Sequence, residues 1–306
     1  MNATRSVLVT GASSGLGRHA AADLAKAGWH VVLGCRDVQR GADAAAWIRG
    51  RHPDASLEVL EMDLASLASV RSAAPRLASA DRPPLHAVVC NAGVQVVDGI
   101  RRSADGHELT FATNHLGHFL LVRLLLDHIA EPGRVVFVAS NTHLGPEHSY
   151  GFPGPVWADP IRLADPERSP VDGSPKGGRQ RYATSKLANV YTTYELARRL
   201  GERRITANAF DPGLMPQTGL SRDYPPLLRR IYLALAPVMI RLLSRAYSVE
   251  DAASALAWLV DSPEPAEVTG GYFVLRRQQP SSPESYDQER AAELWRASEE
   301  LTGVRV

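Results

Sequence analysis

The feature that most limits the fold is a glycine-rich turn near the start of the chain, Gly11-Ala12-Ser13-Ser14-Gly15-Leu16-Gly17. The apolar segment 6–10 before it is predicted to be a short buried strand, and apolar residues after it recur at helical spacing. Glycines between a strand and a helix let the backbone approach a diphosphate at the positive end of the helix dipole. We therefore expect a nucleotide-binding α/β fold. The alternative for such a turn taken alone is an ordinary tight loop.

The end of the second predicted strand, 29–34, bears on which nucleotide is bound. A carboxylate here would bind the ribose hydroxyls and repel a phosphate, but the strand is followed by Cys35 and Arg36. Arg36 offers a planar, permanent charge suited to a 2′-phosphate, with the hydroxyls of Ser13 and Ser14 expected close by. Asp37 is expected to start the next helix. We predict NADP as the cofactor; an ordinary surface arginine is the alternative interpretation of Arg36.

Tyr182 and Lys186 lie four residues apart, on one face if the segment is helical. A free phenol has a pKa near 10, and a nearby cation stabilises its anion. Lowering that pKa by about three units requires roughly 4 kcal/mol, which we expect from the lysine together with a nicotinamide cation. We therefore predict that Tyr182 is a proton donor and that Lys186 lowers its pKa. The alternative is two solvated neighbours on a helix, which would have the same spacing.

Taken in order, these motifs resemble the short-chain dehydrogenase/reductase family across nearly the whole chain. The resemblance implies the catalytic residues Asn114, Ser140, Tyr182 and Lys186. It also implies a cofactor site made of Gly11, Ser13, Ser14, Gly15, Leu16, Gly17, Arg36, Asp63, Leu64, Asn91, Ala92, Gly93, Tyr182, Lys186, Pro212, Gly213 and Thr218. One departure is Cys90, which stands where the family usually has the first of two asparagines.

The mechanism that the resemblance implies is hydride transfer between NADPH and a carbonyl carbon. Ser140 would hold the carbonyl oxygen, and Tyr182 would exchange the proton with it. Lys186 would lower the pKa of the phenol and bind the nicotinamide ribose. Asn114 would hold a water that links Lys186 to solvent. Reduction is the expected direction, because cells generally keep NADP reduced.

Within the family, the segments 114–119, 212–220 and 293–303 are most similar to the retinol dehydrogenase and protochlorophyllide reductase branch. The first function hypothesis is an NADPH-dependent reductase of a carbonyl, or the reverse alcohol dehydrogenase, acting on a lipophilic molecule. The second is reduction of a polarised carbon-carbon double bond. The third, a nucleotide sensor or scaffold without turnover, conflicts with the complete catalytic set.

Length and composition agree with one domain, 1–306, built as a Rossmann-type doubly wound parallel sheet flanked by helices. The 34 basic and 33 acidic residues give no electrostatic reason to expect nucleic acid. Cys35 and Cys90 are predicted to be free buried thiols in a reducing compartment. The first strand begins too early for a signal peptide, so we expect a cytoplasmic enzyme. We predict no metal site and interpret His115 and His118 as helix residues beside Asn114.

Three segments depart from a minimal version of this fold. Segment 143–181 is rich in Pro and Gly, and we expect its prolines, Pro160 and Pro175 among them, to break any long helix. We interpret it as a partly ordered flap beside the substrate. Segment 214–247 is predicted to be a helical substrate lid with an apolar lining, although packing on the body of the protein or resting on a membrane surface would explain its pattern too.

The third segment, 276–306, is predicted to be a helical tail. No apolar run is expected to reach the length of a transmembrane helix. A homodimer is our expectation for the assembly, although the flap and the tail are placed where they would cover the usual interface.

Overall fold

Alternate residues of the central strands pack into different layers, as expected for a sheet covered on both faces. The computed structural model describes residues 4–78, 82–215, 241, 243 and 245–304. Its eight-stranded sheet has the order β3-β2-β1-β4-β5-β6-β7-β8, parallel except for β8. The strands are β1 Ser6–Thr10, β2 His30–Cys35, β3 Leu57–Glu61, β4 Leu85–Cys90, β5 Ile129–Val138, β6 Ile205–Asp211, β7 Tyr272–Val274 and β8 Arg277–Gln279. The predicted doubly wound fold is confirmed.

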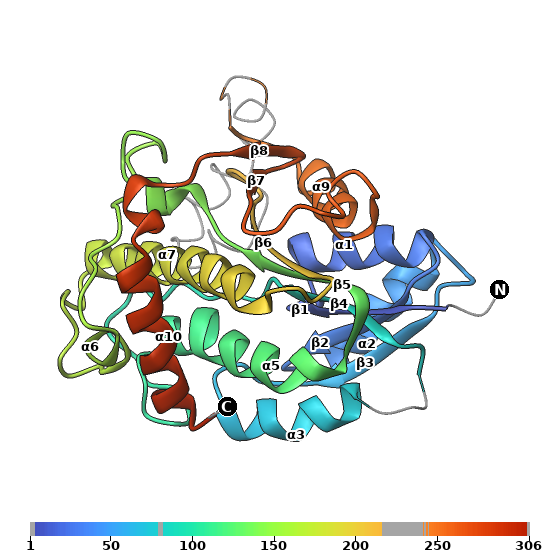
Figure 1. Ribbon diagram of the computed structural model, residues 1–306, viewed down its shortest axis with the longest axis horizontal. Helices are drawn as coiled ribbons and strands as arrows, with labels where there is room; N and C mark the ends of the chain where they lie inside the picture. Colours follow the sequence, from blue (N-terminus) through green and yellow to red (C-terminus); the bar gives the residue numbers. More distant parts are fainter. Residues whose placement is uncertain (1–3, 79–81, 216–240, 242, 244, 305–306) are drawn as a thin grey trace.

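Helices lie on both faces of this sheet, with α1 and α9 above it and α3 and α5 below it in Figure 1. Val9 and Phe210 face the α1 and α9 layer, whereas Leu8 and Ala207 face the α3, α5 and α7 layer. The longer helices are α1 Gly15–Lys26, α2 Val38–Arg49, α3 Leu67–Leu77, α5 Gly117–Leu125, α7 Pro175–Leu200, α9 Val249–Asp261 and α10 Gln288–Thr302. The shorter ones are α4 Leu109–Phe111, η1 Ala112–Leu116, η2 Leu126–His128, η3 Asn141–Leu144, α6 Pro160–Ala164 and η5 Pro283–Tyr286.

The strand order reverses between β1 and β4, which places the carboxyl ends of β1, β4, β5 and β6 around one crevice. Ligands of open α/β sheets bind at this switch point. The residues that follow these strands are therefore the ones that build the site.

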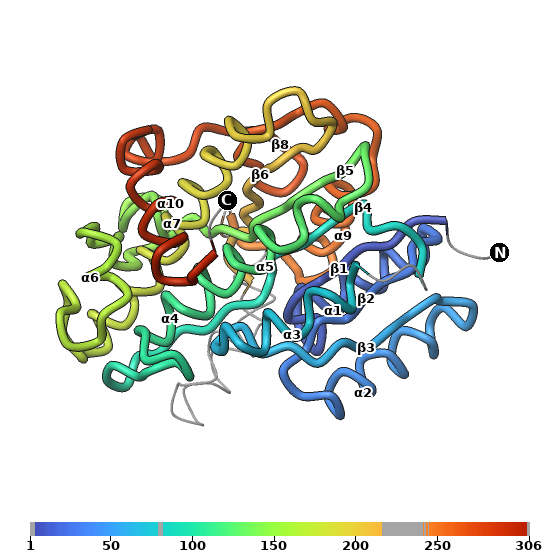
Figure 2. Tube along the Cα trace, turned by 60° about the horizontal axis from the view of Figure 1, so that its bottom comes forward, coloured from blue at the N-terminus to red at the C-terminus, as the bar shows by residue number. Residues whose placement is uncertain are grey.

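The flap, segment 143–181, packs along α7 rather than standing away from the protein. The ring of Trp157 meets that of Tyr191 at 4.8 Å between centroids, and the backbone N–H of Val156 donates to Thr184 Oγ1 at 3.0 Å. Figures 1 and 2 both show this segment with α6 beside α7 and α10, at the opposite end from the N-terminus. No helix runs through Pro160 or Pro175, in agreement with the expectation that these prolines break long helices. Each is the first residue of a helix, where its missing N–H costs nothing.

The predicted tail begins with a strand and not with a helix. Residues 276–306 include β8, which pairs antiparallel with β7, before η5 and α10 follow. Helix α10 then lies along α7 and α5, with Trp295 buried between them. The predicted lid, 214–247, falls almost entirely on residues outside the described part of the chain.

One segment corrects the expectation about apolar runs. Leu109–His128, made of α4, η1, α5 and η2, is long enough to span a membrane and has a mean hydropathy of 1.2. Its most apolar window is 78% buried inside the protein. Because a core helix has the same length and hydropathy, we assign this segment to the core of the fold.

Candidate active site

The glycine-rich turn after β1 packs closely against Asn91 and Ala92, so that two of its glycines have no room for a side chain. Gly11 has a φ of +66°, and a Cβ added to Gly17 would lie 2.5 Å from Asn91 Nδ2. Thr10 holds the two motifs together, because its Oγ1 accepts the backbone N–H of Asn91 at 2.9 Å and of Ala92 at 3.0 Å. Sequence reasoning missed Thr10, since a threonine that ends a strand carries no motif of its own.

The start of α1 fits the diphosphate of a dinucleotide. Gly15 has a φ of +53°, and a Cβ there would meet nothing within 4 Å, so the turn faces open space. The helix is preceded by Ser14, whose side chain makes no capping hydrogen bond. The first-turn N–H groups therefore lack a side-chain acceptor and point to where an anion binds.

The residues after β2 fit a 2′-phosphate. Arg36 is exposed, and its guanidinium forms no hydrogen bond or ion pair with the residues that the structure describes. The hydroxyl of Ser13 is hydrogen-bonded to the thiol of Cys35, the residue before Arg36. Burial raises the pKa of that thiol to about 11. Asp37 is the N-cap of α2, accepting from the backbone N–H of Arg40 at 3.1 Å, as predicted. The two cysteines are both free and buried, also as predicted.

Asn114 lies in a π-helical turn, η1, and both polar atoms of its side chain are hydrogen-bonded to protein groups. Its Oδ1 accepts from the N–H of Val94 at 2.7 Å, while its Nδ2 donates to Val94 O and to Ser185 Oγ, both at 2.9 Å. Asn114 thus fastens the loop after β4 to α7. The water link that we predicted for Asn114 stays a prediction. A Cβ on Gly93 would lie 3.4 Å from Asn114 Oδ1 and 3.6 Å from Lys186 Nζ, so these three residues meet.

Tyr182 and Ser140 meet at the carboxyl end of β5. Tyr182 is only 8% exposed, and its side chain is hydrogen-bonded to that of Ser140. Burial raises the pKa of Tyr182, the Asp211 carboxylate raises it further, and the Ser140 hydrogen bond opposes them. In the protein without cofactor, burial and Asp211 outweigh the Ser140 hydrogen bond, so Tyr182 is a neutral phenol. The lowering of this pKa that we expected from Lys186 together with a nicotinamide cation stays a prediction.

Lys186 is buried one helical turn after Tyr182. Its Nζ lies 5.6 Å from the centre of the Tyr182 ring and donates to Val138 O at 2.8 Å. Burial lowers the pKa of Lys186 to about 8, and the charge of Asp211 opposes this shift. The lysine is therefore an ammonium at neutral pH, close to its titration range. The four predicted catalytic residues lie together at one edge of the sheet.

The remaining predicted cofactor residues surround this edge. Asp63 closes the turn after β3 by accepting from the N–H of Ala65 at 2.9 Å, and Leu64 beside it is buried. Pro212 and Gly213 follow β6, where Gly213 has a φ of +69°. Thr218 lies outside the described residues.

Asp211, immediately before Pro212, was missed by sequence reasoning. It is 1% exposed and accepts from the Tyr272 hydroxyl and from the Gly213 N–H, both at 2.8 Å. The available signal was an aspartate that ends an otherwise uncharged strand.

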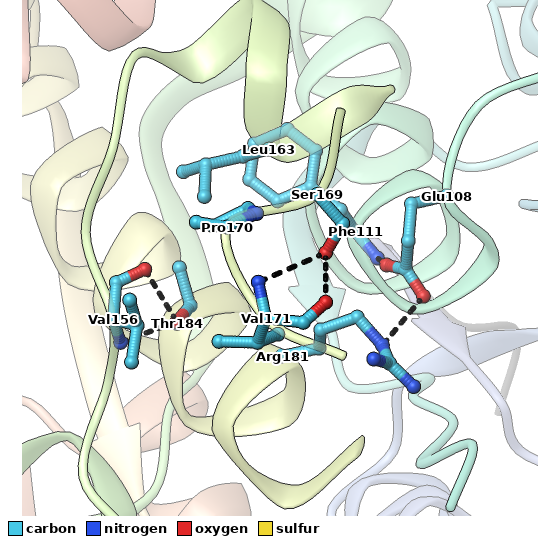
Figure 3. Close-up of a pocket in the computed structure, with 9 residues that line it drawn as sticks. All are labelled: Glu108, Phe111, Val156, Leu163, Ser169, Pro170, Val171, Arg181 and Thr184. Carbon is cyan, nitrogen blue, oxygen red and sulfur yellow. Dashed lines mark hydrogen bonds and ion pairs between the residues drawn. The ribbon is translucent and has the colours of Figure 1, made fainter. Parts of the chain in front are cut away.

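A pocket lies on the other side of α7, between this helix, α4 and the flap (Figure 3). It is lined by Glu108, Phe111, Val156, Leu163, Ser169, Pro170, Val171, Arg181 and Thr184. None of the four predicted catalytic residues lines it, so we do not assign the substrate to it. Its polar wall is the ion pair of Glu108 and Arg181, with Oε1 and Nε 3.4 Å apart.

Comparisons with known proteins decide the family. Residues 5–151 match the family model described as short chain dehydrogenase. Retinol dehydrogenase 14 of Mus musculus is 35% identical over 316 residues, which cover 98% of this chain and 86% of that protein. The chain belongs to the short-chain dehydrogenase/reductase family. Its members are oxidoreductases, and the predicted resemblance is confirmed.

Two further members show the breadth of the likeness. The chloroplastic protochlorophyllide reductase of Daucus carota is 35% identical over 319 residues, covering 98% of this chain and 78% of that protein. A short chain dehydrogenase from Burkholderia cenocepacia J2315, solved in complex with NADP, superposes with a TM-score of 0.64 at 24% identity. The superposition covers 90% of this chain and 97% of that one, and it establishes the shared fold.

Proposed function

We propose that this short-chain dehydrogenase/reductase is an NADPH-dependent reductase of a carbonyl group on a lipophilic small molecule. The observation that supports it most directly is a neutral, buried Tyr182 phenol hydrogen-bonded to Ser140, with the Lys186 ammonium one turn away. A neutral phenol beside a hydroxyl is able to donate a proton to an oxygen that both groups hold.

The cofactor proposal rests on this chain's own residues. The open glycine turn at Gly15 fits a diphosphate, and Arg36 fits the 2′-phosphate that distinguishes NADP from NAD. When bound, NADPH would supply the hydride to the carbonyl carbon. The NADP complex of the Burkholderia structure and the protochlorophyllide reductase relative are consistent with this cofactor.

The residues divide the remaining work. Ser140 donates a hydrogen bond to the carbonyl oxygen and stabilises the charge that develops on it. Tyr182 transfers its proton to that oxygen, and the Lys186 ammonium stabilises the resulting phenolate. Asn114 is hydrogen-bonded to Val94 and to Ser185, and so holds the loop after β4 against α7. The retinol dehydrogenase relative supports a lipophilic substrate.

The test is oxidation of NADPH, with NADH in parallel, against lipophilic ketones, aldehydes and enones, followed by product identification. Alcohol formation that depends on NADPH is the expected result. Saturated ketones as products would instead favour reduction of a carbon-carbon double bond, the activity for which the protochlorophyllide reductase relative is named. Tight NADPH binding without oxidation on any compound would contradict both and favour a sensor.

Tyr182→Phe tests the proton donor. We expect kcat to fall by about 10²- to 10⁴-fold, because general acid catalysis contributes that much, while the Kd for NADPH stays nearly unchanged. Tyr191→Phe is the matched control, since Tyr191 is a buried tyrosine of the same helix whose hydroxyl donates to Glu284 O at 2.8 Å. A Tyr182→Phe enzyme that keeps most of its activity would refute the mechanism.

A further inference from the structure

Asp211 is a buried carboxylate with only neutral partners in contact. It is 1% exposed, its Oδ1 accepts from the Gly213 N–H, and its Oδ2 accepts from the Tyr272 hydroxyl. Across the described ranges of the chain, no Lys, Arg or His nitrogen lies within 4.0 Å of its oxygens. A buried charge without a counter-charge is costly, so a compensating cation is expected at longer range.

The direction of the Asp211 side chain follows from the strand. Ala209, two residues earlier, packs with Val190 and Tyr194 of α7, whereas Phe210 packs on the opposite face with α1 and α9. Side chains two apart on a strand share a face. Asp211 therefore faces α7, the helix that carries Tyr182 and Lys186.

Lys186 is the matching cation. It is 3% exposed, and among the residues that the structure describes no carboxylate oxygen lies within 4.0 Å of its Nζ. Its acceptor, the carbonyl of Val138, belongs to the residue paired with Phe210 in the β5–β6 register. The next residue, Ala139, donates to Phe210 O at 2.7 Å. The lysine is thus anchored one residue from Asp211, on the neighbouring strand.

Other titratable groups close to Asp211 do not replace this cation. His143 is neutral, because its Nδ1 donates to Ser140 O at 2.6 Å and its Nε2 accepts from the Ser282 N–H at 3.2 Å. Tyr272 and Tyr182 are phenols. Arg245 is a partly exposed cation whose charge acts on Tyr272. Lys186 is a positively charged side chain buried on the face that Asp211 occupies.

We propose that Asp211 is a positioning residue that acts as the counter-charge of Lys186, keeping the lysine an ammonium and Tyr182 in its proton-donating form. The effect of Asp211 on the reaction rests on the proposed function of the enzyme. A fixed negative charge favours the protonated state of both groups, so that Tyr182 holds the proton that reduction requires at neutral pH. This agrees with the direction in which Asp211 moves the pKa of each.

Asp211→Asn removes the charge and keeps the shape and an acceptor for Gly213. The chain holds three lysines, Lys26, Lys176 and Lys186, so NMR of 13Cε-labelled lysine follows each one, with Lys186 assigned from Lys186→Arg. We expect the midpoint of Lys186 in the protein without cofactor to fall by about one pH unit, the size expected for a unit charge at this range. Lys26 and Lys176 should keep their midpoints.

Tyr272→Phe is the control, because it removes a hydrogen bond from Asp211 and leaves the carboxylate. Its Lys186 midpoint should stay close to that of the wild type. If Asp211→Asn fails to fold, Asp211→Ser makes the same change of charge. A Lys186 midpoint that does not move in a folded neutral variant would overturn the proposal.

The pH profile supplies the catalytic readout. In the reductive direction, the alkaline limb of kcat/KM should move to lower pH by about one unit in Asp211→Asn, because both proton-holding groups lose the stabilising charge. A purely structural role would lower kcat/KM without moving this limb. The NMR titration needs no turnover, so a failure of the proposed function and a failure of this inference remain distinguishable.

Discussion

Arg36 is the residue at which we expect the choice between the two nicotinamide cofactors to be made. A guanidinium-phosphate hydrogen bond contributes about 1.5–3 kcal/mol. Arg36→Asp should therefore raise the Kd for NADPH by about 10- to 100-fold, and the new carboxylate should leave NADH binding equal or stronger. Fluorescence titration with each cofactor measures both constants.

The control for Arg36→Asp is Arg49→Asp in the last turn of α2. It changes the net charge by the same amount at the other end of the helix. An equal loss of NADPH affinity in both variants would show a general charge effect and remove Arg36 from the cofactor site.

The resemblance to the family predicted Asn114, Ser140 and Lys186, and the structure brings these residues to one edge of the sheet. Their buried polar partners were not predicted. Thr10 and Asp211 act through hydrogen bonds to residues far away in sequence, and no local pattern records such a partner.

The flap, the loop after β4 and α4 all contact one buried cation of α7, Arg181. Arg181, the residue before Tyr182, donates from Nη1 to Asp172 O and from Nη2 to Gly99 O, both at 2.6 Å. Its Nε faces Glu108, whose Oε2 accepts from the Phe111 N–H at 2.7 Å (Figure 3). Burial raises the pKa of Glu108, and Arg181 opposes that shift. One cation thus holds the flap, the loop after β4 and α4 together.

Arg181→Met should lower the free energy of unfolding by about 3–5 kcal/mol, because it leaves the Glu108 carboxylate buried without its cation. Adding Glu108→Gln should recover part of this loss, since the remaining amide carries no charge. Urea unfolding of the two single variants and the double variant measures the coupling. Purely additive losses would mean that the pair does not act as a unit.

The boundaries of the elements show what local sequence rules miss. The strand 6–10 was predicted correctly, because an apolar run followed by glycines has few alternatives. The sequence did not predict that α7 begins at Pro175, where the Ser174 side chain caps the helix by accepting from the Gly177 N–H at 3.1 Å. The same residue types are typical of a loop and of a helix start, and tertiary packing decides between them.

At the scale of the molecule, the parallel sheet could be predicted from alternating strands and helices. The hydrogen bonds that connect its layers could not be predicted, and two buried histidines make such bonds. His118 donates from Nδ1 to Asn114 O at 3.0 Å, and its Nε2 accepts from the Thr10 hydroxyl at 2.8 Å. His115 lies 2.8 Å from Ser298 Oγ and fastens α10 to the core. Each was predicted only as a helix residue beside Asn114.

These histidines make the stability of the whole fold depend on pH. Burial lowers the pKa of His115 to about 3 and that of His118 to about 4, whereas an unfolded histidine titrates near 6.5. Between these values the unfolded chain binds more protons, so the free energy of unfolding falls as the pH drops below 6.5. We expect a loss of about 2 kcal/mol per histidine at pH 5, measured by urea unfolding from pH 7.5 to 5. His115→Gln should flatten this dependence by one histidine's share, whereas His128→Gln, at an exposed position, should leave it unchanged. Equal slopes in the wild type and His115→Gln would contradict a neutral, buried His115.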